Sequence, residues 1–272
     1  MRRFRLAAYV TSFLFATTAA LTGAGAAQAA DTPTTLAATG YVALGDSYSS
    51  GVGAGSYDST SGDCKRSTKA YPALWAAAHS PSSFNFKACS GARTGDVLAN
   101  QLGPLGSGTG LVSISVGGND AGFADVMTTC VLYSESTCLS RINEARAYVT
   151  STLPGKLGQV YSAISAKAPA AHVVVLGYPR FYKIGGSCLA GLSDTERSAI
   201  NSAADLLNST TAKRAADYGF TFGDVTTTFS GHEICSGSSW LHSVNWTNIG
   251  ESYHPTATGQ ASGYLPVFTS AA

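Results

Sequence analysis

The chain has 272 residues, a formal net charge of +1, 30 glycines and six cysteines, and 12% of its residues are charged. A typical globular protein carries about 25% charged residues. Nucleic-acid binding is disfavoured, because a phosphate-binding surface needs clustered lysine and arginine. The hydrophobic fraction of 44% excludes bulk disorder, and the length suits one large domain or two small ones.

The first thirty residues have the pattern of a secretory signal peptide. Arginines at positions 2, 3 and 5 precede an apolar stretch over residues 6–21, and Ala27-Gln28-Ala29 fits a signal-peptidase site. The stretch is too short and too weakly apolar for a spanning helix, so we expect no permanent membrane anchor. Its removal leaves 14 basic and 16 acidic residues. We therefore expect a secreted, extracellular protein with a flexible lead-in over residues 31–39 and its functional domain over 40–272.

The six cysteines are expected to form disulfides, because a secreted chain meets an oxidising environment. No close CxxC pair and no HExxH motif is present, so no metal and no other cofactor is expected. Sequence alone does not choose among the many pairings of six cysteines. A short polar loop between positions 130 and 138 favours pairing in chain order: Cys64–Cys89, Cys130–Cys138 and Cys188–Cys235.

Short apolar runs alternate with longer helical patterns, which indicates an α/β fold with a parallel sheet. Strands are predicted at residues 41–44, 84–88, 111–116, 172–176 and 220–222. Helices are predicted over 71–79, over 94–102, over 139–167 with a kink or break at Pro154, and from a capping box at Ser193 and Glu196 to about Tyr218. We expect a single three-layer α/β/α domain with a five-stranded parallel sheet and long loops at 49–69, 178–192 and 226–253.

Polar, glycine-rich blocks follow three of the predicted strands, where ligands bind in open parallel sheets. They read GDSYSSG from Gly45, CSGA from Cys89 and GGND from Gly117, and a fourth block, ESYHP, begins at Glu251. In this order the blocks resemble the SGNH or GDSL family of serine ester hydrolases, above all its secreted actinomycete lipases and phospholipases. The resemblance runs from residue 41 to the last predicted helix, and it implies a flavodoxin-like fold.

The resemblance also implies a role for each block. Ser47 is expected to be the nucleophile and His254 the general base. The oxyanion hole is expected to consist of the backbone N–H groups of Ser47 and Gly91 and the side-chain amide of Asn119. Ester cleavage needs such a nucleophile, such a base, and donors placed where negative charge develops. The other four histidines, at positions 79, 172, 232 and 242, are expected to have no part in catalysis.

One position departs from the family pattern. Where an aspartate usually stands three residues before the histidine, this chain has Glu251. Either the Glu251 side chain or the backbone carbonyl of Glu251 or Ser252 could orient His254, and the sequence favours neither. Asp46 and Asp120 lie within the blocks and are expected to be structural, bonding backbone N–H groups of their loops.

The resemblance favours a lipase or esterase acting on long-chain acyl esters of lipids, and phospholipase A activity also fits. We expect it to act as a monomer. A carbohydrate O-acetyl esterase is the alternative, since six aromatic residues could line a cleft for either substrate: Trp75, Phe123, Tyr178, Phe181, Trp240 and Trp246. A binding module without catalysis is disfavoured, because all four blocks are intact. An α/β-hydrolase is disfavoured, since no serine stands in a G-x-S-x-G motif.

Overall fold

A five-stranded parallel sheet forms the centre of the computed structural model, which describes residues 40–188 and 191–272. Its strands are β1 (Gly40–Gly45), β2 (Phe84–Phe86), β3 (Thr109–Ser115), β4 (His172–Leu176) and β5 (Thr221–Gly223), in the order β2-β1-β3-β4-β5. This is the strand order of flavodoxin-like sheets, in which ligands bind beside the first strand at its carboxyl end. The expected signal peptide and lead-in lie outside the described residues.

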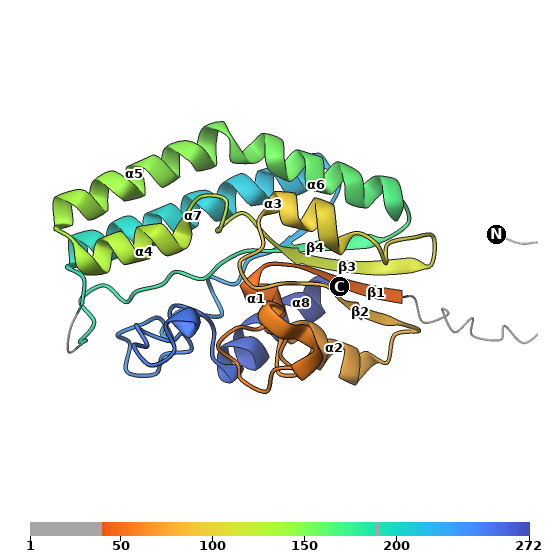
Figure 1. Ribbon diagram of the computed structural model, residues 1–272, viewed down its shortest axis with the longest axis horizontal. Helices are drawn as coiled ribbons and strands as arrows, with labels where there is room; N and C mark the ends of the chain where they lie inside the picture. Colours follow the sequence, from red (N-terminus) through yellow and green to blue (C-terminus); the bar gives the residue numbers. More distant parts are fainter. Residues whose placement is uncertain (1–39, 189–190) are drawn as a thin grey trace, which may run out of the picture. The chain divides into compact units, whose positions relative to one another are not determined.

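Helices cover both faces of this sheet (Figure 1). One side carries α3 (Thr94–Asp96) with a π-helical turn at Val97–Gln101, α4 (Phe123–Leu132), α5 (Glu135–Ser151), α6 (Leu153–Lys167) and α7 (Asp194–Asp217). The other side carries α1 (Ser47–Ser50), α2 (Tyr71–His79) and α8 (Leu265–Ala271), with a π-helical turn at Gly259–Tyr264. Two 3₁₀ helices lie at Ser59–Cys64 and Ile249–Glu251. Among the residues described, no helix is long and apolar enough to cross a membrane.

The core lies on both faces of the sheet. On one face, Tyr41 of β1 stacks on Phe268 of α8 with ring centres 5.5 Å apart, and Tyr71 of α2 meets Phe268 edge to face. On the other, Leu153 and Leu157 of α6 are fully buried. Burying one large apolar side chain stabilises a fold by about 1.5–3 kcal/mol. The two layers therefore hold the sheet whose carboxyl edge carries the polar blocks.

The five strand predictions and the α/β/α architecture are confirmed, with small shifts at strand ends. Every residue of β1 is buried, as expected for a continuous apolar run in a doubly covered parallel strand. Helix α7 also begins and ends as predicted. Its capping box has Ser193 N–H donating to Glu196 Oε2 at 2.8 Å and Glu196 N–H donating to Ser193 Oγ at 3.2 Å, and Gly219 follows with φ of +71°.

The long helix predicted over 139–167 is two helices. The break falls at Thr152, because Pro154 occupies the first turn of α6, where its missing N–H costs nothing. Helix α5 starts earlier than predicted, at Glu135, and α4 was not predicted at all. The segment between Cys130 and Cys138 is consequently not a polar loop but the end of α4 and the first turn of α5.

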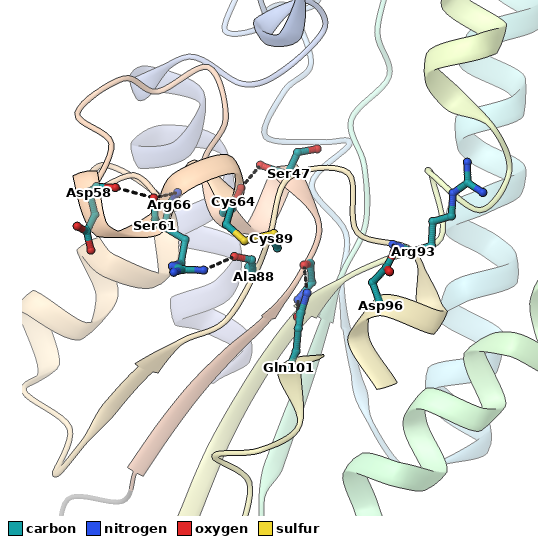
Figure 2. The surroundings of a disulfide bond; sticks show 12 residues. Ser47, Asp58, Ser61, Cys64, Arg66, Ala88, Cys89, Arg93, Asp96 and Gln101 are labelled. Atoms are coloured by element: carbon teal, nitrogen blue, oxygen red, sulfur yellow. Dashed lines mark hydrogen bonds between the residues drawn. A yellow bond between two sulfur atoms is a disulfide. The ribbon is translucent and has the colours of Figure 1, made fainter. Parts of the chain in front are cut away.

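Three disulfides join segments that follow the strands. Cys64–Cys89 connects the loop after β1 to the turn after β2 (Figure 2), and Cys188–Cys235 connects the loops after β4 and β5. Cys130–Cys138 joins α4 to α5. The bonds thus brace the loops at the carboxyl edge of the sheet, where the site lies.

Candidate active site

Ser47 is presented by a sharp turn between β1 and α1. Gly45 makes the turn possible, because its φ is +119° and a Cβ there would lie 2.4 Å from the Ser115 carbonyl oxygen. Asp46 then caps α1, its Oδ1 accepting the Tyr48 N–H at 3.0 Å. Ser47 is the first helical residue, and Gly51 in the left-handed region ends the helix after one turn. The turn places the Ser47 hydroxyl at the carboxyl edge of the sheet.

His254 meets Ser47 from near the other end of the chain. Its Nε2 lies 2.7 Å from Ser47 Oγ, and its Nδ1 lies 3.0 Å from the Ser252 carbonyl oxygen. A carbonyl can only accept, so Nδ1 carries the proton and Nε2 is left free to accept the Ser47 hydroxyl proton. The imidazole is therefore in the tautomer that a general base for Ser47 requires.

Burial keeps His254 neutral. Desolvation is the main cause that lowers its pKa from 6.5 to about 4. The charges of His242 and Lys65 lower this pKa further, while the Ser252 carbonyl opposes the shift. Above the shifted pKa the ring is uncharged and able to take a proton.

Glu251 is directed away from His254. Its Oε1 accepts the Tyr57 hydroxyl at 2.8 Å, and the same hydroxyl accepts the Gly53 N–H at 2.9 Å. The Ser252 carbonyl takes the place beside His254 Nδ1. Of the two groups that could orient the histidine, the backbone carbonyl is the one within hydrogen-bond distance of Nδ1.

Two side chains that the sequence did not single out link the segment after β1 to the segment that holds His254. The Tyr48 hydroxyl donates to the Tyr253 carbonyl at 2.7 Å, which ties α1 to the segment holding the histidine. His242 was expected to be uninvolved, yet its Nε2 lies 2.8 Å from the Gly53 carbonyl oxygen and its backbone N–H donates to the His254 carbonyl at 2.9 Å. Tyr48 stood inside the GDSYSSG block, whereas nothing in the sequence marked His242.

The other three histidines lie at the periphery. His79 Nδ1 is 2.9 Å from the Trp75 carbonyl oxygen, and the two rings stack. His172 Nε2 contacts the Ala271 carbonyl oxygen at 2.6 Å, and His232 Nδ1 contacts that of Ser238 at 2.8 Å. None of the three lines the cavity beside Ser47.

Gly91 and Asn119 line the same cavity as Ser47 and His254. Gly91 has φ of +76° and open space around it, so a substrate can approach its backbone closely. Asn119 Nδ2 donates to the Ala92 carbonyl at 3.1 Å, which uses one of its two amide hydrogens. The contact holds the amide against the Gly91 turn.

The two aspartates of the blocks hold backbone N–H groups, but in different ways. Asp46 bonds the N–H two residues on, as expected, and also accepts hydrogen bonds from Tyr178 Oη and Ser115 Oγ. Asp120 instead bonds across to another loop, accepting the N–H of Thr94 at 3.0 Å and its hydroxyl at 2.6 Å. The turns after β2 and β3 are thereby tied together.

Asp46 is fully enclosed. Desolvation raises the pKa of its carboxyl from 3.8 to about 6, against the hydrogen bonds from Tyr178, Ser115 and the α1 backbone. No group of three or more histidine, cysteine, aspartate or glutamate side chains is placed to hold a metal ion within residues 40–188 and 191–272.

An apolar cavity of about 520 Å³ opens beside Ser47 and His254. Its walls come mainly from α4, α5 and α7, with side chains that include Val126, Met127, Val131, Ile142, Val149, Ile200 and Leu207. These lining side chains are apolar, which suits a hydrocarbon chain.

Of the six aromatic residues that could line the cleft, four line the cavity: Phe123, Tyr178, Phe181 and Trp246. Trp75 and Trp240, the other two, do not line it. Trp75 packs edge to face on Tyr41, and Trp240 stacks on His232 with ring centres 3.6 Å apart. Both are partly buried and pack against neighbouring aromatic rings.

Comparisons with known proteins give close relatives. Residues 43–261 match the model of the GDSL-like lipase/acylhydrolase family. The chain is 74% identical to lipase 1 of Streptomyces coelicolor, and the match covers 100% of both chains. Phospholipase A1 of Streptomyces albidoflavus is 70% identical with a TM-score of 0.85, over 87% of this chain and 100% of that one. The extracellular lipase of Streptomyces rimosus is 71% identical with a TM-score of 0.84, over 86% and 100%.

Proposed function

Because the chain belongs to the GDSL-like lipase/acylhydrolase family and is a carboxylic ester hydrolase of the lipase type, we propose that it cleaves acyl esters through an acyl-enzyme on Ser47. His254 is the general base in this proposal. The observation that carries it is the continuous line from the Ser252 carbonyl through the imidazole to Ser47 Oγ, with contacts of 3.0 and 2.7 Å.

The reaction has two halves. In the first, Ser47 Oγ attacks the ester carbonyl carbon while His254 Nε2 takes its proton, and the imidazolium then gives that proton to the leaving alcohol. In the second, His254 deprotonates a water that attacks the acyl-enzyme, and Ser47 recovers its proton as the fatty acid leaves. The Ser252 carbonyl holds the ring and accepts from Nδ1–H throughout, so the catalytic pair is a dyad oriented by the backbone.

The oxyanion formed in each half is bound by the N–H groups of Ser47 and Gly91 and by the side-chain amide of Asn119. Support comes from the open backbone at Gly91 and from the bond that fixes Asn119 to the Ala92 carbonyl. One such donor contributes about 10²–10³ in kcat. Asn119→Ala should therefore lower kcat by this factor while KM for a p-nitrophenyl ester changes little.

The substrate we propose is a lipid with long acyl chains, including glycerophospholipids cleaved as by a phospholipase A. The apolar walls on α4, α5 and α7 suit an acyl chain, and they offer little to the hydroxyl groups of a carbohydrate ester. We also propose that the protein is secreted without residues 1–30 and works extracellularly as a monomer. Its three disulfides suit an oxidising compartment.

An organophosphate label tests the chemistry, and a chain-length series tests the substrate. Mass spectrometry should find the adduct on Ser47 alone, and Ser47→Ala should abolish both labelling and turnover. With p-nitrophenyl esters, kcat/KM should rise from acetate toward long chains, and phosphatidylcholine should yield free fatty acid and lysolipid. An adduct elsewhere would overturn the nucleophile, and a sharp preference for acetate would overturn the lipid substrate.

A further inference from the structure

Four large apolar side chains stand exposed around the mouth of the cavity. Leu132, Tyr133, Trp246 and Ile249 are 60%, 65%, 72% and 62% exposed. Three of them line the cavity, and Tyr133 directly follows Leu132. We call these four residues the apolar rim. Exposed apolar groups gathered at one place mark an interaction surface, whereas the same groups scattered singly do not.

The rest of the described surface lacks a comparable cluster. The other large apolar side chains that are clearly exposed within residues 40–188 and 191–272 are Phe84 at the edge strand and Ile184 in the loop after β4. Neither lines the cavity. Phe84 and Ile184 therefore serve as controls, since they are exposed apolar side chains like those of the rim but do not line the cavity.

Both sides of the apolar rim are held in position by their own bonds. Next to Leu132 and Tyr133, the Cys130–Cys138 disulfide ties the end of α4 to α5, and the Tyr133 N–H donates to the Thr129 carbonyl at 3.0 Å. The exposed side chains on this side therefore come from a braced helix end.

On the other side, Asn245 organises the turn that carries Trp246 and Ile249. Its Oδ1 accepts the N–H groups of Thr247 and Asn248 at 3.1 and 3.2 Å, and its own N–H donates to Ser252 Oγ at 2.8 Å. This turn leads directly to the Ser252 carbonyl and His254. The exposed side chains are thus connected to the catalytic segment by a short, bonded stretch of chain.

We propose that the apolar rim docks the enzyme onto a phospholipid bilayer. The rim is continuous with the cavity, so an acyl chain leaving the bilayer can enter the cavity without crossing water. Tryptophan and tyrosine prefer the level of the lipid headgroups, where one end of the ring is apolar and the other is wet. The inference needs the ester hydrolase activity of the family but not the roles proposed for Ser47 and His254.

A cation at the mouth favours a phosphate-bearing surface over a droplet of neutral lipid. The Lys65 ammonium lies beside Gly250, 3.4 Å from where a Cβ on that glycine would stand, and Gly250 lines the cavity. No ion-pair partner of Lys65 occurs in the described part of the chain. Its charge is therefore available to a lipid phosphate when the rim is seated.

Binding should be measured with hydrolysis blocked. Mature protein carrying Ser47→Ala is mixed with vesicles of phosphatidylcholine and phosphatidylglycerol, and bound protein is measured by co-sedimentation. The fluorescence of Trp246 should shift to the blue and be quenched by brominated lipid. Trp246→Ser with Ile249→Ser, and separately Leu132→Ser with Tyr133→Ser, should each raise Kd about tenfold or more, given the apolar area lost from the contact.

The controls make the outcome decisive. Phe84→Ser and Ile184→Ser should leave Kd unchanged, and Lys65→Gln should weaken binding more as the phosphatidylglycerol fraction rises. Circular dichroism checks that each variant is folded. Equal binding by the rim variants and the parent, or binding to triolein droplets without binding to vesicles, would overturn the proposal. Residual turnover in Ser47→Ala would instead count against the nucleophile, and the docking result would stand.

Discussion

The Tyr48 hydroxyl donates a hydrogen bond of 2.7 Å to the backbone carbonyl of Tyr253. One partner directly follows Ser47 and the other directly precedes His254, so this bond joins the two segments that must stay in register. Tyr253 has φ of +66°, which is unusual for a residue with a side chain. The bond therefore helps to hold Tyr253 in this left-handed backbone conformation.

Tyr48→Phe should impair catalysis more than its effect on stability suggests. It leaves a buried carbonyl unpaired, which lowers the free energy of unfolding by about 1–3 kcal/mol. Misplacement of His254 should also lower kcat by about tenfold to a hundredfold. Tyr71→Phe is the matched control, because its hydroxyl contacts Ser49 Oγ at 3.0 Å without touching the histidine segment. Urea unfolding and steady-state kinetics on both variants test this prediction. Equal losses of kcat in Tyr48→Phe and Tyr71→Phe would contradict a positioning role for Tyr48.

Glu251→Gln should retain kcat within about tenfold. The loss of a triad carboxylate can cost about 10⁴ in kcat, but the Glu251 carboxylate bonds Tyr57 rather than the imidazole. Tyr57→Phe, which removes the other partner of the same bond, should behave similarly. A fall of kcat by several thousandfold in Glu251→Gln alone would show that the carboxylate acts on His254 during turnover.

Activity should persist well into acid. Because burial lowers the pKa of His254 to about 4, the free enzyme keeps its base neutral until the pH approaches that value. At pH 5.5 kcat/KM should remain near its neutral value, whereas a histidine with a pKa of 6.5 would leave about a tenth. The pH profile of a soluble p-nitrophenyl ester measures this. Asp46→Asn removes the buried carboxyl whose pKa is raised to about 6, so an inflection that stays near pH 6.5 in both proteins would refute the prediction.

Stability should respond to pH with opposite signs at His254 and Asp46. The unfolded histidine binds a proton below its ordinary pKa of 6.5 and the folded one only below about 4, so its contribution is present above 6.5 and lost as the pH falls toward 4. For Asp46 the folded pKa is raised from 3.8 to about 6, so its contribution falls as the pH rises through that window. As the pH rises from 4.5 to 7, the free energy of unfolding measured with urea should therefore increase more for Asp46→Asn than for wild type.

The Cys64–Cys89 disulfide should matter more for turnover than Cys130–Cys138. Figure 2 shows the bond near Ser47. Cys89 lies two residues before Gly91, and the Ser90 N–H donates to the Cys64 carbonyl at 3.1 Å. Removing either disulfide should cost about 2–4 kcal/mol in unfolding. Only the Cys64→Ser, Cys89→Ser pair should also lower kcat at temperatures where both proteins are folded. Equal kcat in the two double variants would contradict this.

The sequence predicted what depends on local pattern. Continuous apolar runs predict the buried strands, and the Ser193–Glu196 capping box predicts the start of α7. Helix α4 was missed because the residue before it, Gly122, offers no side-chain cap. Part of its apolar surface also faces the cavity and solvent rather than a continuous core.

The parts of the site that escaped prediction depend on contacts between distant segments. Whether Glu251 reaches the histidine is decided by Tyr57, which lies 194 residues away in the chain. The role of the Ser252 carbonyl depends on the orientation of its peptide group toward His254 Nδ1, which the type of side chain at position 252 does not predict. His242 likewise gains its importance from Gly53, a residue whose neighbours the sequence does not reveal.

Ser47 and His254 are 207 residues apart, and β1, β2 and β3 all precede the histidine segment in the chain. A chain that grows from its N-terminus therefore carries the serine through nearly the whole of its synthesis without the imidazole. If Ser47 and His254 act as proposed, any product that ends before residue 254 would lack the base for Ser47. The order of the chain thus makes ester cleavage depend on a segment that is synthesised near the end.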